Sequence, residues 1–164
     1  MEIRVADLAD QAEIIALYER SQLATGLPNP LLVPSSELGQ KLYQRHAIER
    51  FVAVEAGRIV GHALIEEPNP NHEEEWRHAL QNTDGPLMEM GAAFVEPALS
   101  GRGIWTALLH HRIKAIRETS AYPVTATWSV NEHVKRTFRS HGGMYATRQS
   151  TPLGEVDLFV FQLQ

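Results

Sequence analysis

Residues 95–104 read VEPALSGRGI, and they are the most informative part of the sequence about the fold. It follows an apolar run over 87–95, interrupted only by Glu89, which predicts a strand. A helix is expected over 103–118. Gly101 and Gly103 remove side chains from the turn, so consecutive N–H groups can face an anion. The start of the helix adds unpaired amides and a positive dipole end.

This strand, glycine corner and helix suit a diphosphate, and Arg102 can add a full charge. The corner is not a Walker loop, since no Gly-Lys-Ser/Thr follows, and the full G-x-G-x-x-G pattern is missing. Taken alone, the corner is also consistent with a purely structural turn.

Strands and helices alternate on both sides of this corner. The remaining strands are expected over 3–5, 51–54, 59–65, 124–130, 144–151 and 156–163, and the remaining helices over 9–22, 35–45, 72–80 and 131–141. Thr25–Pro34 contains one glycine and three prolines and predicts a loop. The order of elements indicates an α/β (α+β) chain, with a mixed sheet and helices on both faces.

Composition narrows the class of protein. The chain has 164 residues, 43% apolar and 21% charged, which favours one globular domain. The net charge of -5 comes with scattered Lys and Arg, so a nucleic-acid partner is not expected. No cysteine is present, which excludes Cys-ligated zinc and a Cys nucleophile. The sequence lacks an apolar segment of spanning length, so a cytoplasmic protein without a membrane partner is expected.

Two motifs together resemble the GNAT acetyltransferase superfamily. The first is Val95-x-Pro-x-x-Ser-Gly-Arg-Gly-Ile104 followed by Ala107-Leu-Leu109, which is similar to that family's coenzyme A motif. The second is Asn131-x-x-Val134 followed by Phe138 and His141-Gly-Gly143. The openings Arg4-Val-Ala-Asp7 and Val54–Gly61 are also family-like, so the resemblance covers essentially the whole chain. Ser100 and Trp105 depart from the family pattern, which has Gln or Arg and then a small residue at these positions.

The resemblance implies one acyl-CoA N-acyltransferase domain over 1–164, with a GNAT-like and mostly antiparallel sheet of about seven strands. It implies acetyl-CoA as co-substrate, no metal, and direct attack of an amine on the thioester. The residues expected to bind the cofactor are Phe94, Val95, Ser100, Gly101, Arg102, Gly103, Ile104, Asn131 and Phe138. Phe94 and Val95 would act through their backbone, and Asn131 would contact the pantetheine arm. Capping of a helix is the alternative role for Asn131.

The amine must lose a proton before it attacks, so a base is needed. Glu89 is the first candidate, because it is the only charged residue in its apolar strand, and an outward, solvated side chain is the alternative. His62 is the second candidate for the base, and the alternative is a histidine of the core or the surface without a catalytic role. The family often places a tyrosine acid where this chain has Phe138, and Tyr145 or Tyr122 is a substitute candidate, with packing as the alternative role of each.

The acceptor is expected to be a small-molecule amine or a peptide. By the resemblance, the acceptor pocket would be lined by the Thr25–Pro34 loop, with the acidic stretch Glu66–Asp84 as a second candidate lining. Homodimers are common in the family, so a homodimer is a candidate assembly for this chain. A non-catalytic coenzyme A sensor or interaction module is the alternative function, and transfer of a longer acyl chain is a third. Arg112, in the apolar stripe of the 103–118 helix, is expected to reach the surface with its stem buried.

Overall fold

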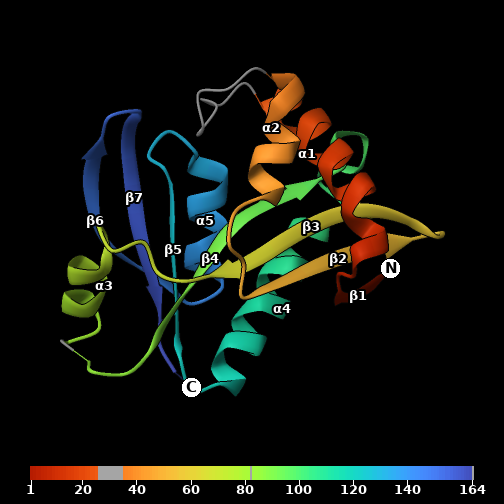
Figure 1. Ribbon diagram of the computed structural model, residues 1–164. Coiled ribbons are helices and arrows are strands. Elements are labelled where there is room, and N and C mark those ends of the chain that lie inside the picture. Colours follow the sequence, from red (N-terminus) through yellow and green to blue (C-terminus); the bar gives the residue numbers. More distant parts are fainter. Residues whose placement is uncertain (26–34, 82, 164) are drawn as a thin grey trace. The chain divides into compact units, whose positions relative to one another are not determined.

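A computed structural model describes residues 1–25, 35–81 and 83–163 (Figure 1). The strands are β1 (Glu2–Val5), β2 (Glu49–Glu55), β3 (Arg58–Glu66), β4 (Leu87–Val95), β5 (Tyr122–Trp128), β6 (Gly143–Thr151) and β7 (Gly154–Phe161). The helices are α1 (Gln11–Thr25), α2 (Ser35–Tyr43), α3 (Glu73–Ala79), α4 (Ile104–Glu118) and α5 (Glu132–Ser140), with short 3-10 turns η1 (Leu8–Asp10) and η2 (Pro97–Leu99). The expected elements are therefore confirmed. The expected loop lies outside the described residues except for Thr25, which is instead the last residue of α1.

The strands form one seven-stranded sheet in the order β1-β2-β3-β4-β5-β7-β6. β4 and β5 run parallel, with Leu87 opposite Tyr122, while the β1–β2, β5–β7 and β6–β7 pairs are antiparallel. β7 lies between β5 and β6, so the last strand of the chain is not an edge strand. This order confirms the mixed, mostly antiparallel GNAT-like sheet that the sequence predicts.

The chain divides into two compact units. The first contains residues 1–64 and 92–111, and the second contains residues 65–91 and 112–164. β3, β4 and α4 each contribute residues to both units.

In the first unit, helices cover both faces of the strands. Ile14, Leu17 and Tyr18 of α1 pack with Val52 of β2, and α2 lies beside α1 (Figure 1). Neighbouring residues on a strand point to opposite faces. Phe51 accordingly contacts His111 of α4, with ring centroids 4.8 Å apart.

The second unit is built around β7 in the same way. Val156, Leu158 and Val160 pack with Trp76 and Leu80 of α3, which Figure 1 shows beside β6 and β7. The alternate residues Phe159 and Phe161 instead face Phe138 of α5, with ring centroids 5.3 and 6.0 Å apart. Because successive residues on a strand point opposite ways, α3 and α5 cover opposite faces of β7.

Arg112 corrects one expectation from the sequence. Its side chain does not reach the surface; the residue is 2% exposed, and Nη1 donates to the carbonyl of Gly91 at 2.9 Å. Burial lowers the pKa of Arg112 to about 10, and the buried Glu66 carboxylate opposes that shift. The prediction that its head group reaches water was wrong because a carbonyl and a carboxylate are available inside the unit.

Candidate functional site

The glycine corner between η2 and α4 is open and rich in donors. Gly101 and Gly103 have φ of +81° and +78°, and a Cβ at either position would meet no atom within 4 Å. Within the described ranges, the amides of Gly101, Gly103 and Ile104 have no hydrogen-bond acceptor. They stand at the start of a 15-residue helix, whose dipole favours an anion at this end. The corner can therefore bind a diphosphate through its backbone.

The side chains around the corner offer fewer free donors to an anion than the backbone does. Arg102 is exposed and already paired with Glu55, with N–O distances of 3.1 and 2.9 Å. Ser100 is exposed and its amide donates to the Pro97 carbonyl. Ile104 is buried in the core, where its side chain would touch any Cβ added to Gly61. Only the amide of Ile104 is thus available to a ligand.

The last two residues of β4 and the residue that follows them each contact a side chain of α1. The contacts are a 4.7 Å ring pair between Phe94 and Tyr18, a 2.9 Å bond from Ser21 Oγ to the Val95 carbonyl, and a Glu96–Arg20 ion pair at 2.8 Å. They fix the backbone at which an N–H is expected to meet a developing oxyanion. Sequence reasoning missed Ser21 and Arg20, because their partners lie more than seventy residues away.

His62 lies on β3 and is completely buried. Its Nδ1 is 2.7 Å from the hydroxyl of Tyr18, and the two rings meet edge to face at 5.0 Å. Both side chains therefore have a hydrogen-bond partner inside the first unit, as buried polar groups usually do.

Glu89 lies on β4 and is half-buried, with Oε2 accepting the Asn69 amide at 2.8 Å. This bond comes from the segment between β3 and α3 and orients the carboxylate. In the β4–β5 pairing Glu89 stands opposite Val124.

Phe138 and Tyr145 lie against the same β7 residue. Phe138 is buried and packs on Phe159 and Phe161, so its ring belongs to the core of the second unit. Tyr145 is exposed on β6, and its ring contacts Phe159 at 5.8 Å. The Tyr145 hydroxyl is therefore on an accessible side chain, whereas Phe138 has no proton to donate.

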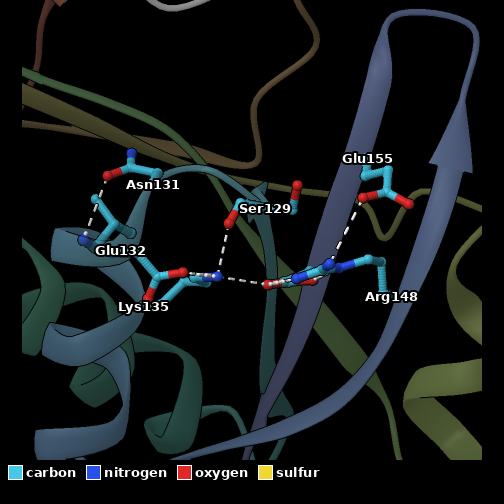
Figure 2. Close-up of polar contacts among 8 residues, drawn as sticks. Ser129, Asn131, Glu132, Lys135, Arg148 and Glu155 are labelled. Atoms are coloured by element: carbon cyan, nitrogen blue, oxygen red, sulfur yellow. Dashed lines mark hydrogen bonds and ion pairs between the residues drawn. The ribbon is translucent and has the colours of Figure 1, made fainter.

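Asn131 is the N-cap of α5, and its Oδ1 accepts the Val134 amide at a long 3.4 Å. Figure 2 shows the polar contacts beside it. Lys135 reaches from α5 to the Ser129 carbonyl and to Asp157 of β7. Arg148 of β6 bonds the same Asp157 carboxylate. Sequence reasoning missed Lys135 and Asp157, although Asp157 is a charged residue in an apolar run, the same signal that singled out Glu89.

The expected site residues fall in both units. Those from 94 to 104 and His62 belong to the first, while Glu89, Asn131, Phe138 and Tyr145 belong to the second. The described part of the chain holds no group of three or more His, Cys, Asp or Glu side chains arranged to bind a metal ion. In that same part, each helix is too short or too polar to cross a membrane.

Comparisons with known proteins agree with this geometry. Residues 12–142 match the model of the acetyltransferase (GNAT) family. An N-acetyltransferase from Staphylococcus aureus Mu50 is similar in structure, with a TM-score of 0.74, 18% identity, and coverage of 99% of this chain and 98% of that chain. The ribosomal-protein-alanine N-acetyltransferase from Brucella melitensis is also similar in structure, with a TM-score of 0.74, 21% identity and coverage of 100% of both chains.

YncA from Salmonella typhimurium, solved with its cofactor acetyl-CoA, gives a TM-score of 0.72 at 21% identity and covers 100% of this chain and 94% of that chain. No curated protein sequence matches this chain. At these identities the solved structures establish the fold, and the family model establishes membership. The chain belongs to the acetyltransferase (GNAT) family.

Proposed function

We propose that this GNAT enzyme moves the acetyl group of acetyl-CoA to a primary amine of a small molecule or peptide, by direct attack in a ternary complex. The observation that carries the proposal is the glycine corner, where three backbone amides lack an acceptor among the described residues. The proposal treats residues 1–164 as one acyltransferase domain. The cytoplasmic location expected from the sequence stays a prediction.

The corner fits the diphosphate of coenzyme A. The amides of Gly101, Gly103 and Ile104 would donate to phosphate oxygens, and the dipole of α4 adds to their field. No Cβ occupies the space in front of either glycine. Arg102 would share its guanidinium between Glu55 and a phosphate.

Other residues would hold the remainder of the cofactor. The Val95 region would face the acyl group through its backbone, which Ser21 of α1 keeps in place. Asn131 would contact the pantetheine arm, and the buried Phe138 would support that region from the core.

The chemistry required of the chain is modest, because acetyl-CoA supplies an already activated acyl group. The amine nitrogen bonds to the thioester carbon, its proton passes to the Glu89 carboxylate, and the carbon–sulfur bond breaks to release the thiolate. Because a thiol has a pKa of about 8.5, its thiolate can depart without first receiving a proton from a general acid. Tyr145 is the proposed proton donor for the leaving thiolate. His62 is kept as the second candidate base, although its ring is buried with Tyr18.

A thiol-release assay with acetyl-CoA and a panel of amines tests the proposal. We expect Glu89→Gln to lower kcat by roughly 10²- to 10⁴-fold, the usual contribution of a general base, while acetyl-CoA binds as before. Glu13→Gln is a matched control, since Glu13 is also half-buried and accepts a backbone amide, that of Ile59, at 2.9 Å. Equal turnover in both variants would remove Glu89 as the base.

A non-catalytic coenzyme A sensor or interaction module is the second candidate. It is favoured by Phe138, a buried ring where the family often has a tyrosine acid. Tight binding of coenzyme A without thiol release across the whole amine panel would select this candidate. Faster release from a longer thioester would instead indicate a different acyl donor.

The proposed partners follow from the same reaction. A small-molecule or peptide amine is the acceptor, and neither nucleic acid nor a membrane takes part. A homodimer, common among GNAT proteins, stays a prediction, and light scattering on the purified protein measures it.

A further inference from the structure

A buried ion pair joins α5 to β7 in the second unit (Figure 2). The side chain of Lys135 is 4% exposed and that of Asp157 is 2% exposed. Lys135 Nζ lies 2.9 Å from Asp157 Oδ2. Neither charge is accounted for by the binding and proton-transfer steps proposed above.

Each donor of the Lys135 ammonium has its own acceptor. Besides Asp157, Nζ lies 2.6 Å from the Ser129 carbonyl and 2.5 Å from Oε1 of Glu132. An ammonium has three N–H groups, so this set uses all of them. The three acceptors come from β7, from the turn after β5 and from the first turn of α5.

Asp157 is fixed from the opposite side by Arg148. Arg148 Nε lies 2.7 Å from Oδ1 and Nη2 lies 3.2 Å from Oδ2, and the two residues are register partners in the β6–β7 pair. The bond from Arg148 is the main cause that lowers the pKa of Asp157, and Lys135 lowers it further. The pKa of Lys135 is raised, first by Glu132 and then by Asp157. Both groups are therefore charged at neutral pH.

The segment that this pair holds is the turn from Ser129 to Asn131. The Ser129 amide donates to the Glu155 carbonyl at 2.9 Å, and the Asn131 amide donates to the Trp128 carbonyl at 2.9 Å. Lys135 supplies two more, from Nζ to the Ser129 carbonyl and from its backbone amide to the Asn131 carbonyl at 3.1 Å, and the Glu132 amide donates to the Val130 carbonyl between them at 3.0 Å. A single residue thus fixes both carbonyls that flank this turn.

Stability alone does not explain a buried ammonium at this position. Replacing a buried ion pair by apolar residues of similar volume is often neutral or stabilising. An apolar side chain, however, cannot bond the Ser129 carbonyl. The bond of Asn131 Oδ1 to Val134 is long at 3.4 Å, so the cap itself holds Asn131 only weakly.

We propose that Lys135, anchored by Asp157, is a positioning residue. It fixes the backbone of the Ser129–Asn131 turn and thereby directs the side-chain amide of Asn131 toward the pantetheine arm. The proposal rests on the proposed function, which gives Asn131 that contact. Lys135 acts through Asn131 and touches no part of the cofactor.

Calorimetry on Lys135→Met with two ligands tests this role. Coenzyme A carries the pantetheine arm, while 3′-phosphoadenosine 5′-diphosphate keeps the diphosphate but lacks the arm. We expect the Kd of coenzyme A to rise roughly three- to tenfold, the value of one neutral hydrogen bond, and the Kd of the fragment to stay unchanged. Glu132→Gln is the control, because this partner of Lys135 is 65% exposed, and both affinities should stay unchanged.

A double-mutant cycle separates positioning from a general structural effect. Asn131→Ala with Lys135→Met should bind coenzyme A no more weakly than Asn131→Ala alone, since Lys135 acts through the amide that is already missing. Additive losses would overturn the proposal. An equal loss of affinity for the arm-less fragment would overturn it as well, because that result means a general disturbance of the fold.

Asp157→Asn decides the matter if Lys135→Met does not fold. It removes the anchor charge and keeps the size of the side chain, so we expect a smaller rise in the coenzyme A Kd with no change for the fragment. Unchanged coenzyme A affinity in the folded variant overturns the positioning role alone. A wild-type chain that binds neither ligand overturns the proposed function, and this inference with it.

Discussion

Gly103→Ala tests whether the glycine corner binds coenzyme A, provided that the stability cost of a side chain at positive φ is measured separately. Gly103 has φ of +78° with open space in front of it, so the added methyl group meets no neighbour. The cost comes only from the backbone, because an L-residue in the left-handed region loses roughly 1–2 kcal/mol. For a chain of this length, that corresponds to a fall in Tm of about 2–8 °C.

Gly57→Ala is the matched control. Gly57 lies in the turn between β2 and β3 with φ of +75° and also has no neighbouring atom within 4 Å. Its replacement should cost the same stability as that of Gly103. The turn at Gly57 is not part of the corner that would bind the diphosphate, so coenzyme A affinity should not change in this variant.

The expected change in the Kd of coenzyme A follows from the negative charge of its diphosphate. An alanine at 103 relieves the strain of a positive φ by turning toward negative φ, which points its amide away from the phosphate and loses a hydrogen bond to a charged group worth roughly 1.5–3 kcal/mol. We therefore expect the Kd of coenzyme A to rise about 10- to 150-fold in Gly103→Ala. Scanning calorimetry measures the stability of both variants, and titration calorimetry measures their affinities. Equal coenzyme A affinity in the two variants at equal stability would refute the proposed cradle.

Two further predictions concern charges. Glu55→Gln should release Arg102 for a phosphate and tighten coenzyme A binding by up to about fivefold at low salt, an effect that titrations at high salt should abolish. Stability should fall as the pH drops below about 4, because Arg4 and Arg148 lower the pKa values of Asp10 and Asp157. The unfolded chain then binds protons that the folded chain does not; urea titrations across pH 2–6 measure this slope, and Asp157→Asn should flatten it.

The sequence predicts the elements well where apolar periodicity is strong. β4 begins and ends at the expected residues, 87 and 95, because its run is bounded by prolines on either side. β5 begins at Tyr122, two residues earlier than expected, since Pro123 is accommodated opposite Met88 in the parallel pair. β5 also ends earlier, at Trp128, where the Ser129–Asn131 turn begins.

The partners of the candidate site residues could not be read from the sequence. His62 and Tyr18 are 44 residues apart, and no local pattern indicates that they share a hydrogen bond. The prediction for Arg112 failed for the same reason, because Gly91 reaches it only through the folding of a different strand. Periodicity identifies which residues are buried, whereas the pairing of buried polar groups depends on tertiary structure.

The alternation along β7 also bears on how faithfully the sheet assembles. A slip of one residue would exchange the two faces of the strand and bring Asp157 to the side lined by Trp76 and Leu80. There its carboxylate would be buried among apolar side chains without Lys135, which would cost several kcal/mol of folding free energy. A single acidic residue in the middle of the strand therefore disfavours a one-residue slip in the register of β7.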